Sequence, residues 1–111
     1  MGAYSTRQVI LLPFPYSDLS AQKVRPALLL ADAGRGDWVL CQITSKPYAD
    51  GHAIELTQTA FEQGSLQRIS YARSSKLFTA NESLFAGVAG RIKTVNQQLV
   101  INEIMRLLSL G

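Results

Sequence analysis

An arginine–proline pair at the start of an apolar run is the feature of this sequence with the most chemical content. Arg25 is followed by Pro26 and then by the apolar residues 27–31. The guanidinium group presents a rigid fork of donors that matches the oxygens of a phosphate. Because the residue before a proline is kept out of the helical region, Arg25 should be extended or in a turn, at the mouth of a strand. The pair therefore predicts an anion-binding arginine on a restrained backbone.

Hydroxyl groups follow the end of a second apolar segment. Residues 38–43 are rich in aromatic and β-branched types, and Thr44, Ser45 and Lys46 come directly after them. Both hydroxyls are suited to donating hydrogen bonds to a phosphate. An arginine and hydroxyl donors in one site would stabilise the negative charge that develops when a phosphodiester bond is cleaved. Without the neighbouring motifs, Thr44 and Ser45 would more simply mark the end of a strand.

The elements that must hold these groups are short strands separated by turns. Pro13 and Pro15 should stop the first strand, because proline cannot donate to a ladder. The polar residues 16–24 predict a long loop, and residues 32–37 predict a turn. Apolar runs and alternating patterns predict strands at residues 9–12, 27–31, 38–43, 53–56, 69–73 and 85–92.

The last segment predicts an amphipathic helix. Thr94 and Gln97 fit a capping box, with Thr94 as the N-cap. Leu99 and Leu110 fall among polar residues, and scattered exposed leucines are a simpler interpretation than a subunit contact. The apolar residues that gather on one side at helical spacing are Val100, Ile101, Ile104, Met105, Leu107 and Leu108.

Length and element content predict one domain, residues 1–111, of the mainly β class. A chain of 111 residues is near the usual domain size and can bury a hydrophobic core without the help of disulfides or a structural metal. Many short strands and a single terminal helix favour a small β-barrel over a parallel α/β sheet. Composition does not choose between an SH3-like and an OB-like barrel.

Charge and cysteine content set broad limits on location and partners. Eleven basic and eight acidic residues give a net charge of +3, which permits an anionic partner without requiring one. The single cysteine, Cys41, excludes an internal disulfide and fits a reducing compartment. The sequence shows neither an apolar run long enough for a membrane span nor the apolar core of a signal peptide. We therefore expect a cytoplasmic protein without a membrane contact.

Other reactive residue types are better explained as structural. His, Cys, Asp and Glu show no metal-ligand spacing, so we expect neither a metal nor a cofactor. His52 lies in a predicted turn and is interpreted as a surface residue rather than a base. Cys41, inside an apolar strand, is interpreted as core rather than nucleophile. Tyr16, Tyr48 and Tyr71 are candidate platforms for stacking bases.

Three sequence blocks, in this order and at this spacing, carry a family resemblance. They are the strand with Pro13-Phe14-Pro15 followed by Ser17-Asp18-Leu19-Ser20, the Lys23-Val24-Arg25-Pro26 block with its apolar run, and Gln42-Ile43-Thr44-Ser45-Lys46. Residues 70–77 and 90–92 add weaker support. Through these blocks the chain resembles the PemK/MazF family of type II toxin endoribonucleases.

The resemblance implies a fold, an activity and partners. The fold would be an SH3-like barrel with a C-terminal helix, assembled as a homodimer. The activity would be metal-independent cleavage of single-stranded RNA, often mRNA, at short sequence motifs. A small cognate antitoxin protein would neutralise it.

The resemblance also implies roles for individual residues. Arg25 and Thr44 fall on the catalytic arginine and hydroxyl of the family, and Arg73 falls on a second arginine. Ser75 stands where one branch has an aspartate, proposed there as the general base, so that base is missing here. The residues expected to bind substrate are Ser45, Lys46, Tyr16, Ser17, Lys23, Ser75 and Lys76.

Alternatives stay open at this point. Arg25 could form a surface ion pair with Asp18. The barrel could also be a non-catalytic nucleic-acid-binding module or a gyrase poison, although the chain ends at residues 108–111 without the near-terminal tryptophan of the gyrase poisons. The cleavage motif should depend on the loops at residues 16–24 and 46–68.

Overall fold

The structure is a computed structural model that describes residues 3–15, 22–46 and 50–110. These residues form a seven-stranded antiparallel sheet in the order β4-β6-β3-β2-β1-β7-β5, together with one α-helix. The elements are β1 (Gln8–Pro15), β2 (Gln22–Gly34), β3 (Asp37–Thr44), β4 (Ala53–Leu56), η1 (Gln58–Ala60), β5 (Phe61–Gly64), β6 (Ser70–Asn81), η2 (Glu82–Leu84), β7 (Gly87–Ile92) and α1 (Thr94–Ser109).

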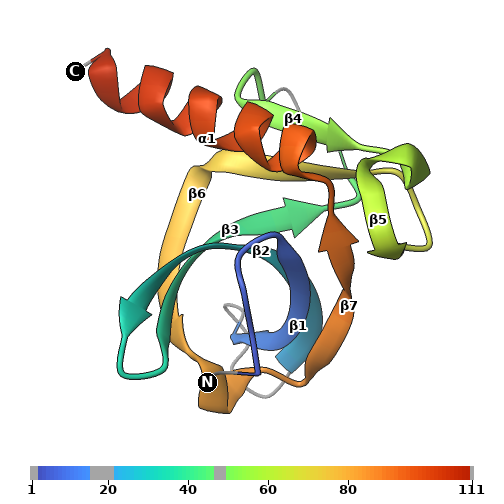
Figure 1. Ribbon diagram of the computed structural model, residues 1–111, viewed down its shortest axis with the longest axis vertical. Helices are drawn as coiled ribbons and strands as arrows, with labels where there is room; N and C mark the ends of the chain where they lie inside the picture. Colours follow the sequence, from blue (N-terminus) through green and yellow to red (C-terminus); the bar gives the residue numbers. More distant parts are fainter. Residues whose placement is uncertain (1–2, 16–21, 47–49, 111) are drawn as a thin grey trace.

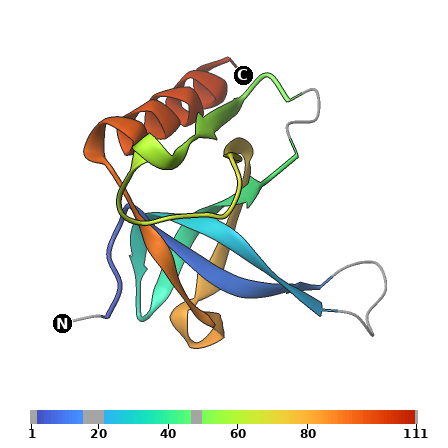
Figure 2. The same cartoon turned by 90° about the vertical axis from the view of Figure 1, so that its right-hand side faces the viewer.

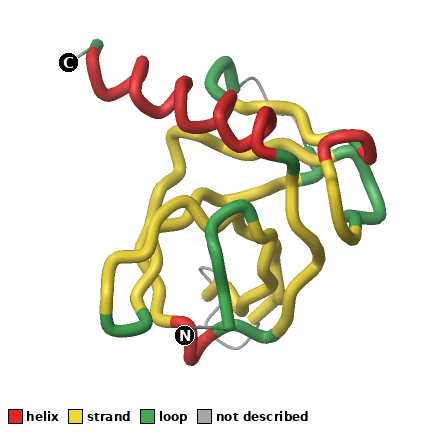
Figure 3. Tube along the Cα trace, in the orientation of Figure 1, coloured by secondary structure: helices red, strands yellow, loops and turns green. Residues whose placement is uncertain are grey.

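The sheet curls into a half-open barrel, and α1 lies across one end of it, beside β4 and β6 (Figures 1 and 3). The predicted mainly β, SH3-like barrel with a C-terminal helix is confirmed. Successive residues of the central strands point to opposite faces of this sheet. Val9 and Leu28 belong to a buried cluster with Val100 of the helix, whereas Ile10 and Leu29 belong to a second buried cluster. Burial on both faces explains why these strands are continuous apolar runs in the sequence.

The first strand does not stop at the prolines, as predicted, but runs through Pro13 to Pro15. It pairs with β2 along its whole length, whereas its pairing with β7 ends at Leu11. Beyond Leu11 the other side of β1 is a sheet edge, where proline is tolerated because no donor is needed there. β1 and β2 therefore run out together as a two-stranded ribbon (Figure 2).

Other strand boundaries also differ from the prediction. The second strand begins at Gln22 rather than residue 27, because β1 pairs with the polar residues before Arg25. The strand predicted at 69–73 continues to Asn81, and the strand predicted at 85–92 starts at Gly87. The short strand β5 was not predicted at all. The strands at 38–43 and 53–56 are confirmed.

The helix lacks the predicted capping box. Lys93 is the N-cap, without a side-chain bond, and Thr94 is the first helical residue. The Gln97 side chain is buried and donates from Nε2 to the Leu29 carbonyl at 3.3 Å, so it contacts the sheet instead of the helix start. That carbonyl also accepts a hydrogen bond from the Arg7 backbone N–H at 3.2 Å, so the Gln97 amide is its second donor.

The buried face of α1 is narrower than predicted. Val100 and Ile104 are buried, but Met105 and Leu108 are 59% and 71% exposed. The C-terminal turns of α1 extend past β6 (Figure 1), so they have no sheet surface to cover. Leu99 and Leu110 are exposed in the single chain, as both scattered exposed leucines and a subunit contact would have it.

Gly64→Ala should lower the free energy of unfolding by about 2 kcal/mol or more. Gly64 has a φ of +68°, and a Cβ there would collide with the carbonyl oxygen of Ala89. Urea unfolding would measure the loss. Gly51→Ala is the matched control, because a Cβ at Gly51 would meet no atom within 4 Å. Equal stability of the Gly64 variant and wild type would contradict this packing.

Candidate functional site

A cleft of about 630 Å³ lies between the β1–β2 ribbon and the loop that joins β5 to β6. We call it the Arg25 cleft. Its size is within the usual range for ligand-binding pockets. Its lining residues are Leu11, Lys23, Val24, Arg25, Pro26, Ser45, Ser65, Leu66, Gln67, Arg68, Ser70 and Ala89.

The Arg25 cleft is cationic. Lys23, Arg25 and Arg68 contribute three positive side chains, and Ser45 is one of three serines in the lining. Among the described residues that line the cleft there is no carboxylate and no imidazole. Cations gathered in a concave surface raise the local concentration of anions, so the cleft is suited to a phosphate-bearing ligand.

Arg25 lies inside β2 rather than at its mouth, in the extended backbone that Pro26 predicts. It faces Leu12 of β1 in the ladder. The β2–β3 ladder begins only at Ala27, which faces Gln42. Continuing that register by two residues brings Arg25 level with Thr44. The predicted arginine and the predicted hydroxyls therefore come from neighbouring strands at one end of the sheet.

The two predicted hydroxyls have different surroundings. Thr44 is only 9% exposed, and its Oγ1 accepts a hydrogen bond from the Lys46 backbone N–H at 3.1 Å. Ser45 is exposed and lines the Arg25 cleft. Of the two, Ser45 is thus the hydroxyl that a ligand in the cleft meets directly, and Thr44 supports the turn that presents it.

Arg73 is not part of the lining of the Arg25 cleft. It lies on β6, facing Ala53 of β4, and its Nε donates to Oδ2 of Asp50 at 2.9 Å. The Asp50 side chain is 7% exposed. The bond from Arg73 lowers the pKa of Asp50, and the backbone N–H of His52 adds to the effect.

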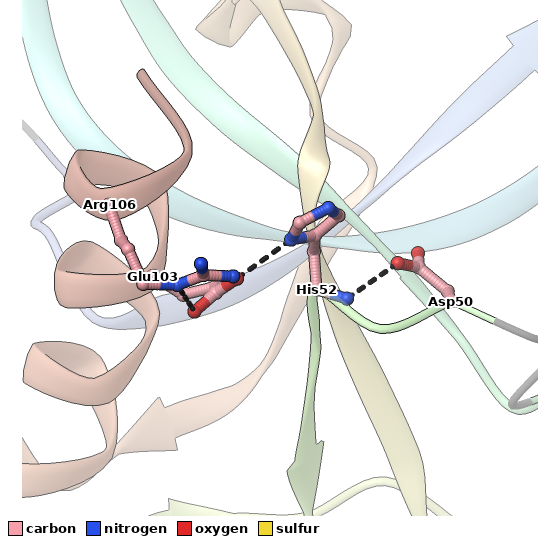
Figure 4. A network of polar contacts seen from close by, with 4 residues as sticks. All are labelled: Asp50, His52, Glu103 and Arg106. Atoms are coloured by element: carbon pink, nitrogen blue, oxygen red, sulfur yellow. Dashed lines mark hydrogen bonds and ion pairs between the residues drawn. The ribbon is translucent and has the colours of Figure 1, made fainter. Parts of the chain in front are cut away.

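From Asp50 a polar network extends to the helix, and Figure 4 shows its members Asp50, His52, Glu103 and Arg106. Asp50 Oδ1 accepts from the backbone N–H of His52 at 2.9 Å, and His52 Nδ1 lies 2.8 Å from Oε2 of Glu103. Arg106 donates to both carboxylate oxygens of Glu103. His52 is therefore a structural contact between the β4 region and α1.

Glu103→Gln should lower the melting temperature near neutral pH, and the difference from wild type should shrink in acid. The pKa of Glu103 is lowered to about 2, first by hydrogen bonds from Arg106 and then by His52. A lowered pKa means stabilisation that is present above the ordinary value of 4.5 and is lost as the pH falls toward 2. Thermal melts from pH 7 to pH 2.5 would measure it.

Glu55→Gln is the matched control for that series, because Glu55 is an exposed carboxylate on β4. Its melting temperature should follow wild type throughout. A deficit of Glu103→Gln that stays constant down to pH 2.5 would contradict a role for the ionised carboxylate.

The remaining predicted residues are dispersed. Gln42 faces residues 73–76 of β6 across a bulge, which places Ser75 and Lys76 at a bend of that strand. Both are exposed, and Lys76 lines a separate groove of about 450 Å³ beside Phe14. Lys46 is exposed but is not among the lining residues of the Arg25 cleft. The predicted residues outside the described part of the chain are Tyr16, Ser17, Asp18 and Tyr48.

Residues of the loop between β5 and β6 were missed as individual site residues. Gln67 and Arg68 line the Arg25 cleft from the loop between β5 and β6, whereas Lys23 and Arg25 line it from β2. The sequence marked this segment only as part of a variable loop, because it has no periodic pattern. The only feature of the sequence that could have pointed to this loop was a basic residue, Arg68, just before a predicted strand.

Within residues 3–15, 22–46 and 50–110, His, Cys, Asp and Glu side chains nowhere gather in a group of three that could hold a metal ion. The only α-helix in the same ranges, α1, is too short and too polar to cross a membrane. Cys41 is buried, and burial raises the pKa of its thiol to about 12, which agrees with its prediction as a core residue.

The fold matches solved structures at low sequence identity. One chain of a MazE-MazF crystal structure from Deinococcus radiodurans has a TM-score of 0.78 and 14% identity, with 100% of both chains covered. The Mycobacterium tuberculosis toxin MazF-mt6 has a TM-score of 0.73 and 13% identity, covering 95% of this chain and 99% of that one.

A mycobacterial endoribonuclease in complex with its cognate antitoxin has a TM-score of 0.72 and 14% identity, covering 100% of this chain and 98% of that one. The sequence matches no family model and no curated protein. Identity at this level is evidence of a shared fold alone. The chain has the fold of the MazF toxins.

Proposed function

We propose that the protein is an endoribonuclease toxin of a toxin–antitoxin system, and that it cleaves single-stranded RNA in the Arg25 cleft. The observation that supports this most is the Arg25 cleft itself, a cationic pocket that combines Arg25 with Ser45 on the fold of the MazF toxins. A phosphate and its neighbouring nucleotides are the ligand that such a lining fits.

The proposed reaction uses the nucleophile that RNA carries. The ribose 2′-hydroxyl oxygen attacks the adjacent phosphorus and gives its proton to water, while the bond from phosphorus to the 5′-oxygen breaks and the departing 5′-oxygen takes a proton from water. The products are a 2′,3′-cyclic phosphate and a 5′-hydroxyl. Arg25 and Ser45 would donate to the phosphate oxygens, where negative charge accumulates in the transition state, and Thr44 would hold Ser45 in place.

The proposed mechanism is metal-independent and relies on charge stabilisation. Because the described lining of the Arg25 cleft holds no carboxylate or imidazole, we assign no protein residue as general base. The high pKa of a guanidinium also makes Arg25 a poor acid. Arg73 lies outside the described lining and is held by its ion pair with Asp50, so we assign it no contact with the reacting phosphate.

The antitoxin partner is proposed by analogy with the related structures. A small antitoxin would bind this chain, by analogy with the mycobacterial endoribonuclease, which forms a complex with its cognate antitoxin. The cytoplasm is the compartment where mRNA would be met. We also propose a homodimer, in which a second copy would cover exposed apolar side chains such as Leu99 and Leu108 of α1.

The homodimer should give a molar mass of two chains in light scattering at micromolar concentration. Closed two-fold assembly is the commonest arrangement for soluble oligomers, and it buries apolar surface that would otherwise face water. The measurement is made on the chain without its antitoxin. A clean single-chain mass at the same concentration would contradict the dimer.

The activity is tested by incubating the purified protein with a long single-stranded RNA and mapping the new ends by primer extension. We expect cuts at a few sites that share a short motif. DNA supercoiling by gyrase, measured in parallel, should be unaffected. Binding of RNA without cutting would favour the non-catalytic barrel, and inhibition of gyrase without cutting would favour the gyrase poison.

A further inference from the structure

The loop between β5 and β6 is held at its start by close contact with β7. Gly64 packs on the backbone of Ala89 and Gly90 so closely that neither glycine has room for a Cβ. The Ser65 backbone N–H donates to the Ala89 carbonyl at 3.3 Å. The first residue after β5 is therefore fixed on a strand of the barrel.

The same loop is also held in its middle and at its end. Leu66 packs against the buried cluster that includes Val100 of the helix. Ser70 is 4% exposed, and its Oγ donates to the Arg68 carbonyl at 3.0 Å. These anchors hold the backbone while Gln67 and Arg68 stay exposed, and both line the Arg25 cleft.

The two sides of the Arg25 cleft differ in chemistry. The β2 side carries the cations Lys23 and Arg25, which suit phosphate, and contacts to phosphate carry no sequence information. The loop side carries Gln67, whose amide has two donors and an acceptor, together with Arg68. Side-chain amides can make paired hydrogen bonds to one base edge, and single-stranded RNA exposes such edges.

We infer that Gln67 reads one base of the RNA substrate and that Arg68 binds a neighbouring phosphate. The loop between β5 and β6 is then a determinant of the cleavage motif. This inference rests on the proposed function and adds to it a division of roles. Arg25 contacts the phosphate that reacts, Gln67 selects the sequence, and Arg68 holds the strand.

Gln67→Ala should lower kcat/KM on the preferred site and reduce discrimination at one motif position by about 5- to 150-fold. Gln67→Glu keeps the shape but offers acceptors only, so the preferred base at that position should change, toward cytosine with its amino donor. The measurement is sequencing of all cuts in one long RNA, followed by kinetics on matched oligonucleotides. Gln58→Ala, at an exposed glutamine of η1, is the control.

Arg68→Ala should weaken substrate binding about equally for all sequences and leave the motif unchanged. The slope of log affinity against log salt should fall by about 0.7, the value expected when one phosphate contact to a single strand is lost. Lys93→Ala removes the same charge at an exposed position outside the cleft and should leave the slope unchanged.

The outcomes separate this inference from the proposed function. Cleavage by wild type, together with an unchanged motif and rate in both Gln67 variants, would overturn the base-reading role and leave the proposed function standing. A motif altered by Arg68→Ala would overturn the assignment of that arginine to phosphate. Absence of cleavage by wild type would overturn the proposed function and this inference with it.

Discussion

Arg25→Ala should lower the rate of RNA cleavage by about 10²–10³-fold and leave the protein folded, because it removes one charge-stabilising donor from the transition state. Arg25→Lys should recover little of this rate, since a point charge cannot replace the two parallel donors of a guanidinium. Single-turnover cleavage of an oligonucleotide with one site would measure both rates.

The control for this experiment is Lys93→Ala, which removes one positive charge at an exposed position. It should cleave at the wild-type rate. Circular dichroism and thermal melts should show that all three variants fold. Full activity in Arg25→Ala would show that the reaction occurs elsewhere or that this arginine serves only as a surface charge.

Leu28→Ala should lower the free energy of unfolding by about 2–5 kcal/mol, the range measured for truncation of buried leucines. Leu28 is 0% exposed in the cluster between the sheet and α1, three residues after Arg25 on the same strand. The variant loses transfer free energy and leaves a cavity behind the strand that carries the site. Urea unfolding at fixed protein concentration would measure the effect.

Leu84→Ala is the matched truncation at a leucine of η2 that is 54% exposed, and its effect should stay within about 0.5 kcal/mol. Cleavage by Leu28→Ala should fall in proportion to the fraction unfolded, unlike the loss in Arg25→Ala. A cost below about 1 kcal/mol at Leu28 would contradict the packing between α1 and the sheet.

The strands that the sequence located well are those buried on both faces. Residues 38–41 and the run after Pro26 are apolar without interruption, and both become parts of central strands. The predictions that went wrong depended on partners far along the chain. Pro13 is compatible with a strand only because the pairing of β1 with β7 ends at Leu11. The Gln97 side chain does not form the predicted capping box because it donates to the Leu29 carbonyl, which lies beside the helix.

The residues of the candidate site also fall into those that the sequence predicted and those that depend on distant contacts. The restrained Arg25 and the hydroxyl that follows the strand at 38–43 were available from the sequence, and the structure places Arg25 and Ser45 in one cleft. Gln67 and Arg68 were not available as individual residues, because their place beside Arg25 depends on the contact between Gly64 and Gly90. The bond between Arg73 and Asp50 joins residues 23 positions apart, without any local pattern.

The central claim is that the Arg25 cleft cleaves RNA through the 2′-hydroxyl, without a metal ion. The most direct measurement is to digest a defined single-stranded RNA in excess EDTA and to identify the new ends by mass spectrometry. We expect undiminished cleavage with a 2′,3′-cyclic phosphate on one product and a 5′-hydroxyl on the other. A 5′-phosphate product, or loss of activity on chelation that added metal restores, would contradict the mechanism.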